Sequence, residues 1–295
     1  MPSLTEYLNK PEYVFRPWQA ARRLRRSLTL RGGDGRTVVR LPWRLDLGVR
    51  AADDIGRAIW TMGIYDLAVS EVLWRLTVPG DVVVDGGANL GHMTGLLSRR
   101  AGTSGSVWAF EPHPGVFADL EENVRRWEGE PSLARIELRR EALSDHAGTG
   151  GLVEGPAFAR NRGTAQVVDA GGGVPVPLTT LDARFPSTAL GVLKLDVEGH
   201  EGAALRGAER LIGSRAIRDI VYEAHGAAGG EESAWLEARG YVVFGIGKAF
   251  RGPVLERQLD RPAGRWMPPS WLATSDPERA AALLRPRGWR CLRGR

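Results

Sequence analysis

The chain has 295 residues, 43% of them hydrophobic and 25% charged, and its formal net charge is +5 at pH 7. This composition is ordinary for a globular protein and excludes wholesale disorder, and the length suits one large α/β domain or two small ones. A single cysteine, Cys291, excludes an intrachain disulfide and any metal cluster built on several thiolates.

The positive charge does not by itself indicate a nucleic-acid partner. Only three of the 40 basic residues are lysines, and the arginines accompany 38 glycines and 18 prolines, a bias that GC-rich coding sequences produce. Arginines cluster at 22–26 and near the C-terminus, but charges are mixed elsewhere, so we expect no nucleic-acid partner. No apolar run approaches the roughly 18 residues of a transmembrane segment, and residues 1–10 are polar. A soluble, cytoplasmic protein is therefore expected.

Residues 1–60 are expected to form a preamble that acts as a cap or a dimer element. Between residues 13 and 28, apolar side chains alternate with arginines, which predicts a basic amphipathic helix. This helix is expected to pack on the main domain. The alternatives are contact with a membrane surface or with a second copy of the chain, which would make a homodimer. In residues 38–43 and 45–49, apolar and polar side chains alternate, which predicts two short strands.

The main domain is expected at 61–250. Its helices are predicted near 64–72, 92–100, 116–124, 204–211 and 235–238, and its strands at 81–85, 107–110, 136–138, 192–195, 217–222 and 241–244. This alternation predicts an α/β fold with a doubly wound, mostly parallel sheet and helices on both faces. The glycine-rich span 147–178 interrupts the alternation and is expected to be a β-rich insertion.

A glycine-rich turn, Asp85-Gly86-Gly87-Ala88-Asn89-Leu90-Gly91, follows the first buried strand. Glycines there let a ligand approach the backbone, and the next helix offers its N-terminal amides. Glu111 stands 20 residues beyond Gly91, at the end of the next strand, where a Rossmann-type domain places the carboxylate that accepts the ribose hydroxyls. The sequence therefore predicts a nucleoside site.

The residues of the turn indicate which nucleoside is bound. A dinucleotide fingerprint reads G-x-G-x-x-G, whereas here Asp85 heads the turn and Asn89 replaces the middle glycine. A carboxylate repels a pyrophosphate and attracts an amino group. S-adenosylmethionine has an amino group and no phosphate, so it is favoured over NAD.

Several segments together resemble the FkbM family of S-adenosylmethionine-dependent methyltransferases. They are 84–94, Phe110-Glu111-Pro112, 142–145, Thr180-Leu181-Asp182 and Lys194-Leu195-Asp196-Val197-Glu198-Gly199-His200-Glu201. The last segment is the most specific, and Gly86 departs from the valine usual in the family. The resemblance implies a class I methyltransferase fold and a set of cofactor-binding residues. Those at the methionine end are Asp85, Gly87, Asn89 and Gly91; Glu111 holds the ribose, and Glu141 and Ala142 border the adenine.

Two strand ends carry the candidates for proton removal from a hydroxyl acceptor. Asp196 and Glu198 follow the fourth strand, and Glu223 and His225 end the fifth. With a reference pKa of about 6.5, His225 is the natural proton acceptor, and Glu198 or Glu223 would orient it. The alternative for His225 is an ordinary polar residue at a strand end. The same four residues, Asp196, Glu198, Glu223 and His225, would be the ligands if a divalent cation such as Mg²⁺ bound, which is not favoured.

The fourth strand lacks the Asn- or Asp-Pro-Pro-aromatic motif of methyltransferases that modify base amines, which favours an oxygen acceptor. The family resemblance points to a small-molecule hydroxyl, on a macrolide-type natural product or on a sugar. Residues 251–295 form a C-terminal tail in which Trp266 and Trp271 are candidates to cover this acceptor. The alternatives are a non-catalytic nucleotide-binding scaffold, an NAD-linked oxidoreductase and a nucleic-acid methyltransferase. His92 and His113 are expected at exposed loop positions.

Overall fold

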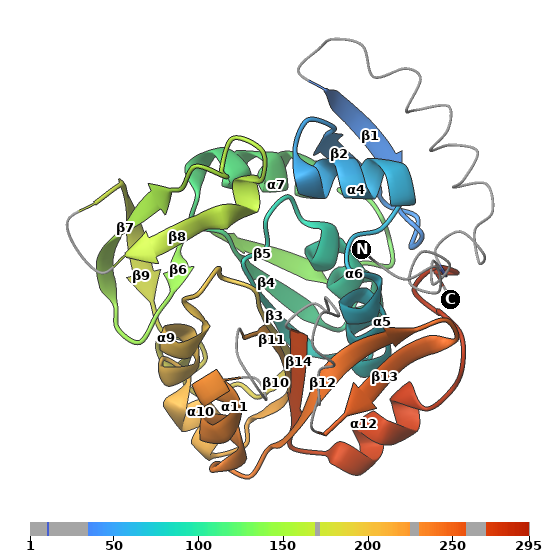
Figure 1. Cartoon of the computed structure of the whole chain (residues 1–295), viewed down its shortest axis with the longest axis vertical. Helices are drawn as coiled ribbons and strands as arrows, with labels where there is room; N and C mark the ends of the chain where they lie inside the picture. Colours follow the sequence, from blue (N-terminus) through green and yellow to red (C-terminus); the bar gives the residue numbers. More distant parts are fainter. Residues whose placement is uncertain (1–10, 12–34, 169–171, 225–229, 258–269, 295) are drawn as a thin grey trace, which may run out of the picture.

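A mixed eight-stranded sheet forms the centre of the molecule (Figure 1). The computed structural model describes residues 11, 35–168, 172–224, 230–257 and 270–294. The strand order is β13-β12-β14-β11-β10-β3-β4-β5, and the five strands from β11 to β5 run parallel. The parallel strands are β3 (Val82–Gly86), β4 (Ser106–Phe110), β5 (Arg135–Arg139), β10 (Leu190–Leu195) and β11 (Ile217–Glu223). Their order and direction confirm the predicted mostly parallel sheet.

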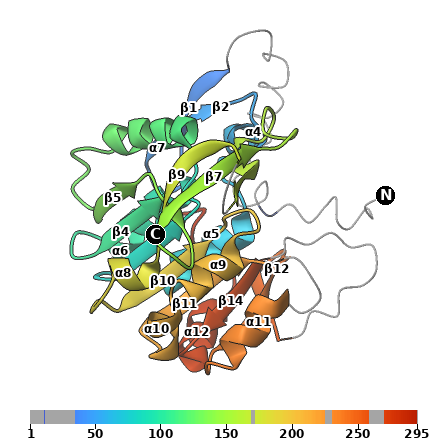
Figure 2. The same cartoon turned by 90° about the vertical axis from the view of Figure 1, so that its left-hand side faces the viewer.

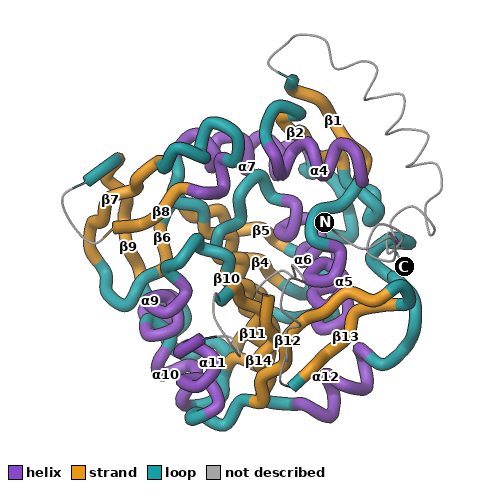
Figure 3. Tube along the Cα trace, viewed as in Figure 1, coloured by secondary structure: helices purple, strands orange, loops and turns teal. Residues whose placement is uncertain are grey.

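Helices cover both faces of this sheet (Figures 2 and 3). One face carries α5 (Leu67–Leu76), α6 (His92–Ala101) and α7 (Pro114–Arg126). The other carries α8 (Leu181–Arg184), α9 (Glu201–Arg206), α10 (Glu209–Gly213) and α11 (Gly230–Glu237). The predicted helix over 204–211 is thus two short helices, and the doubly wound α/β prediction is confirmed.

The sequence accounts locally for where α7 begins. Pro114 occupies the first turn, where its missing N–H costs nothing, and Nδ1 of His113 accepts the amide hydrogens of Gly115 and Val116 at 3.1 and 3.2 Å. Arg125 and Arg126 lie in the last turn, where cations favour the helix dipole. His113 is therefore a buried cap, and its prediction as an exposed loop residue is wrong.

The described part of the preamble packs on α7 and on the core. Strands β1 (Arg36–Arg40) and β2 (Asp46–Arg50) pair as an antiparallel hairpin, and α4 (Asp54–Met62) follows. Leu41, Trp43 and Leu45, in the turn of the hairpin, are buried in the core. The helix predicted between residues 13 and 28 lies outside the described residues, and the limits of the preamble stay predictions.

In its described residues, the span 147–178 is built from strands and one 3₁₀ turn. It holds β7 (Gly148–Glu154), η1 (Arg162–Thr164), β8 (Ala165–Val168) and β9 (Val174–Thr179). Together with β6 (Ala142–Leu143), these strands form a second sheet in the order β6-β9-β7-β8, which lies beside the central sheet in Figure 1.

The C-terminal segment contributes to the centre of the fold. It holds β13 (Gly252–Glu256), β14 (Ser270–Thr274) and α12 (Pro277–Leu284), after β12 (Val242–Ala249). Strand β14 lies antiparallel between β11 and β12, so Trp271 is 1% exposed and belongs to the core. The prediction that Trp271 covers an acceptor is therefore wrong, and Trp266 lies outside the described residues. No helix in the described ranges is both long and apolar enough to cross a membrane.

A buried ion pair anchors the end of the chain on α5. Nε of Arg75 donates to Glu71 at 2.6 Å, and both side chains are fully buried. Arg75 also donates to the carbonyl oxygens of Pro286 and Gly288, while Glu71 accepts the amide hydrogen of Cys291 at 2.8 Å. Because two buried charges satisfy these backbone groups, the C-terminal segment is fixed against the domain.

Candidate active site

The glycine-rich turn connects β3 to α6 at the edge of the sheet where β4, β10 and β11 also end (Figure 1). Gly87, Asn89 and Gly91 all have positive φ angles, of 72°, 49° and 95°. A Cβ atom at Gly87 would overlap the carbonyl oxygen of Asp196, and one at Gly91 would lie 2.9 Å from a methyl group of Leu120. Glycine is therefore required at both positions by conformation and by space.

Asp85 forms a buried ion pair with Lys194. The two residues face each other across β3 and β10, and Nζ of Lys194 lies 3.2 Å from Oδ1 of Asp85. Nζ also donates to the carbonyl oxygen of Gly87 at 2.8 Å, and the Thr94 hydroxyl donates to Oδ2 of Asp85 at 2.7 Å. Burial opposes the charge of Lys194, but Asp85 and Asp196 hold its pKa above the usual value. The pair ties the turn to both strands and to α6.

Glu111 follows β4 and is 7% exposed. Its two carboxylate oxygens accept the amide hydrogens of Asn89 at 3.0 Å and of His113 at 2.9 Å. Burial raises its pKa to about 7 even though these hydrogen bonds lower it. Glu111 thus fixes the turn relative to α7, and each of its oxygens retains capacity to accept a hydroxyl hydrogen.

The first turn of α6 has no side-chain cap. Its N-cap is Gly91, which provides no side-chain acceptor for the first amides of the helix. Helix N-termini of this kind attract carboxylates through their free N–H groups and the helix dipole. The turn, the buried acid and this helix start fit a ligand with a carboxylate and a ribose.

Comparisons with known proteins support the same interpretation. Residues 85–243 match the model of the methyltransferase FkbM domain. The chain belongs to the FkbM methyltransferase family.

Two curated relatives match this FkbM methyltransferase over most of their own length. The 31-O-demethyl-FK506 methyltransferase FkbM of Streptomyces tacrolimicus is 33% identical over 199 residues, which cover 56% of this chain and 74% of that protein. The hexuronic acid methyltransferase AglP of Haloferax volcanii is 30% identical over 180 residues, 60% of this chain and 69% of the relative. A solved structure of methyltransferase FkbM from Methylobacillus flagellatus KT aligns with a TM-score of 0.40 at 17% identity, over 66% of this chain and 43% of that one.

The predicted cofactor, S-adenosylmethionine, is confirmed with the family. The FkbM fold brings five of the seven predicted cofactor residues to one edge of the sheet: Asp85, Gly87, Asn89, Gly91 and Glu111. The other two lie after β5. Ala142 is buried in β6, and Glu141 forms an ion pair with Arg184.

An acidic cluster lies at the ends of β10 and β11 in this FkbM methyltransferase. Oδ2 of Asp196 lies 3.6 Å from Nζ of Lys194. The side chains of Asp196 and Glu223 share a hydrogen bond. Burial and the nearby Asp196 raise the pKa of Glu198 to about 7 and that of Glu223 to about 8. The cluster therefore holds carboxyl groups that change protonation state near neutral pH.

The backbone at Glu198 is unusual. Its φ angle is 54°, a left-handed conformation that non-glycine residues rarely adopt, and Gly199 follows with 93°. Glu201 accepts the amide hydrogens of Val197 and Gly199, both at 2.9 Å, which holds this turn. Such conformations concentrate at functional sites.

His225 lies outside the described residues, so its predicted role stays a prediction. Within the described ranges, no group of three or more His, Cys, Asp and Glu side chains has the arrangement of a metal site. His225, one of the four residues proposed as ligands of a divalent cation, is not among these described residues.

Two residues of the site, Lys194 and Tyr65, had no predicted role. Lys194 is one of only three lysines and interrupts an apolar strand, which is the signal that a buried partner exists. Tyr65 precedes α5 and is 37% exposed. Burial and the charge of Asp196 raise its pKa, so its hydroxyl remains protonated beside the cluster.

His92 is a buried neutral acceptor, and its prediction as an exposed loop residue is wrong. It is 4% exposed, packs edge-on against Trp43 at 5.0 Å and accepts the amide hydrogen of Tyr65 at 3.3 Å. Burial and the charge of Lys194 lower its pKa to about 3. It therefore positions the segment that carries Tyr65.

We expect His92 to lower stability in acid. Its pKa is depressed in the folded state, so its share of the stability is present above about pH 6.5 and is lost as the pH falls toward 3. Urea unfolding of the protein and of His92→Gln between pH 7 and 4 checks this. The variant should lose less stability with falling pH, and equal slopes would show that His92 is charged in the folded protein.

Proposed function

We propose that this FkbM methyltransferase transfers the methyl group of S-adenosylmethionine to a hydroxyl of a small-molecule natural product or a sugar. The observation that carries the proposal is the cluster of proton-accepting carboxyl groups next to the cofactor turn. The relatives support it, since one is named for 31-O-demethyl-FK506 and the other for a hexuronic acid.

The proposed cofactor site uses the predicted residues in distinct ways. Gly87, Asn89, Gly91 and the first amides of α6 hold the methionine end, and Glu111 accepts the ribose hydroxyls. Asp85 is fully buried and paired with Lys194. It therefore acts as a positioning residue that holds the glycine-rich turn in place. Glu141 and Ala142, after β5, border the adenine.

Glu198 is the proposed proton acceptor. When bound, S-adenosylmethionine would supply an electrophilic methyl group to the acceptor oxygen. Glu198 would accept the proton of the acceptor hydroxyl on a carboxylate oxygen. A base with a pKa of about 7 is half ionised at neutral pH, which suits this transfer. Asp196 and Glu223 share a hydrogen bond that orients this end of the cluster.

Calorimetric titration with S-adenosylhomocysteine tests the cofactor site. Glu111→Gln removes a charged acceptor and is expected to weaken binding roughly 10- to 100-fold, because hydrogen bonds to charged groups contribute about 1.5–3 kcal/mol. The control is Glu121→Gln, which lies on α7 with a side chain 55% exposed. Equal affinities of the protein and the Glu111 variant would remove Glu111 from the site.

Transfer from isotopically labelled S-adenosylmethionine to hydroxylated natural products and sugars tests the acceptor class. Mild alkali separates the products, because it hydrolyses a methyl ester and leaves a methyl ether intact. Alkali-stable label on a neutral acceptor supports O-methylation of a hydroxyl. Label found only as an ester or on an amine would contradict it, and cofactor binding without any transfer would favour the non-catalytic scaffold.

A further inference from the structure

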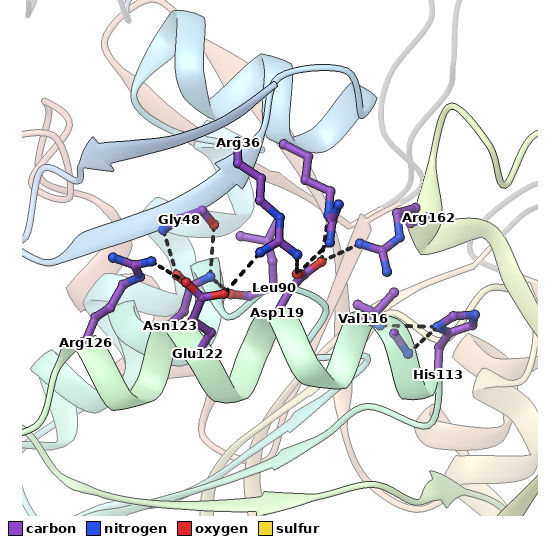
Figure 4. Close-up of polar contacts among 12 residues, drawn as sticks. Arg36, Gly48, Leu90, His113, Val116, Asp119, Glu122, Asn123, Arg126 and Arg162 are labelled. Atoms are coloured by element: carbon purple, nitrogen blue, oxygen red, sulfur yellow. Dashed lines mark hydrogen bonds and ion pairs between the residues drawn. The ribbon is translucent and has the colours of Figure 1, made fainter. Parts of the chain in front are cut away.

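Residues 154–163 lead from the end of β7 into the 3₁₀ turn η1 and are attached to two helices. The amide hydrogen of Arg162 is accepted at 3.0 Å by Asp53, the N-cap residue of α4. The guanidinium group of Arg162 contacts the carboxylate of Asp119 on α7, as Figure 4 shows. This end of the segment is therefore fixed to α4 and α7, the two helices that hold the described preamble and the residues after β4.

The beginning of the segment contacts His113, the cap of α7. Nδ1 of His113 accepts two amide hydrogens of α7, so its ring proton is on Nε2, which donates to Glu154 at 3.0 Å. The ring centroids of Phe158 and His113 lie 4.7 Å apart. The amide hydrogen of His113 is accepted by Oε1 of Glu111 at 2.9 Å. Glu154 and Phe158 thus hold the residue that anchors one oxygen of the Glu111 carboxylate.

The same segment packs against Asn89 of the glycine-rich turn. A Cβ atom at Gly163 would lie 2.9 Å from Nδ2 of Asn89. That side chain is held in place, because its Oδ1 accepts the amide hydrogen of Leu90 at 2.7 Å. The amide hydrogen of Asn89 is accepted by the other oxygen of Glu111, Oε2, at 3.0 Å. Gly163 therefore lies against the residue that anchors the second oxygen.

One segment thus contacts both residues whose amides hold the carboxylate. We propose that Glu154, Phe158 and Gly163 are positioning residues, which keep the carboxylate of Glu111 in the orientation that accepts the ribose hydroxyls of S-adenosylmethionine. Hydrogen-bonding groups of a binding site act at full strength only when supporting contacts hold them within about 0.5 Å of the right position. The inference rests on the proposed role of Glu111 and adds the segment that decides how tightly the hydroxyls are bound.

Calorimetry on the full chain at pH 8, above the pKa of Glu111, tests the inference with S-adenosylhomocysteine and its 2′,3′-dideoxy analogue. The original protein should bind the analogue about 10- to 100-fold more weakly, because the analogue lacks the hydroxyls that a charged acceptor holds. Phe158→Ala and Glu154→Ala should each weaken binding of S-adenosylhomocysteine by about 2- to 10-fold, the size of one aromatic contact or one hydrogen bond. Both variants should bind the analogue unchanged. Val174→Ala is the matched control, since Val174 is 41% exposed on β9 of the 147–178 span.

Three results would overturn the inference. A preference for S-adenosylhomocysteine that both variants retain in full would show that the segment does not act on Glu111. Equal weakening of both ligands would show a general effect on the site. Equal binding of the two ligands by the original protein would remove Glu111 from the ribose site, and the inference would fall with that proposed role. Melting temperatures without ligand separate a changed site from a lost fold, and Glu154, with a side chain 48% exposed, is the position least expected to disturb folding.

Discussion

Replacing Lys194 with methionine is expected to destabilise the protein by about 3–5 kcal/mol. The substitution preserves the volume of the side chain but leaves Asp85 as a fully buried charge without its partner at 3.2 Å. It also removes the donor to the carbonyl oxygen of Gly87. Since a domain is stable by only about 5–15 kcal/mol, this loss is a large fraction of the total.

Urea unfolding of a small set of variants measures the effect. Asp85→Asn combined with Lys194→Met should be more stable than Lys194→Met alone, because the buried charge is gone while an acceptor for Thr94 remains. Arg135→Met is the control, since the Arg135 side chain is 71% exposed on β5. A Lys194→Met protein as stable as the original would show that the ion pair contributes nothing.

The second large effect is expected at Glu198. Glu198→Gln should lower kcat by about 10²- to 10⁴-fold, because positioned proton acceptors contribute factors of this size. The affinity for S-adenosylhomocysteine should stay unchanged, since the side chain is not among the proposed cofactor residues. Glu209→Gln, at a side chain 66% exposed and paired with Arg239, is the matched control.

The dependence of the rate on pH gives an independent readout. The acceptor form of Glu198 is the carboxylate, so kcat should rise with pH through about 7 and level off above about 8. His225→Ala is the decisive comparison. If that variant loses kcat and the rising limb while Glu198→Gln keeps both, His225 is the base and the assignment to Glu198 is wrong.

The raised pKa values of Glu198 and Glu223 make the stability of the protein fall with rising pH, whereas kcat rises. Carboxyl groups whose folded pKa exceeds the unfolded value of 4.5 contribute stability below about pH 4.5 and lose it as the pH rises through 7 to 8. At pH 8, Glu198→Gln should therefore be more stable than the original protein by about 1–2 kcal/mol, a value discounted for the partial exposure of the group. A Glu198→Gln protein that is less stable than the original protein in urea unfolding at pH 8 would contradict the assigned pKa shift.

The sequence was most informative where structure and chemistry are local. The β-branched run of β3, the glycines of the turn and the position of Glu111 follow from backbone conformation and strand length, and these depend on near neighbours in the chain. The parallel sheet with helices on both faces follows from the alternation of short apolar runs and amphipathic segments.

Only the tertiary structure decided which charges pair and which segments enter the core. Lys194 meets Asp85 because β10 and β3 align in one register, and β14 enters between β11 and β12 although it follows β12 and β13 in the chain. The buried positions of His92 and Glu71 likewise depend on distant segments that cover them. Contacts of this kind arise from the register and packing of residues far apart in sequence, and no local spacing encodes them.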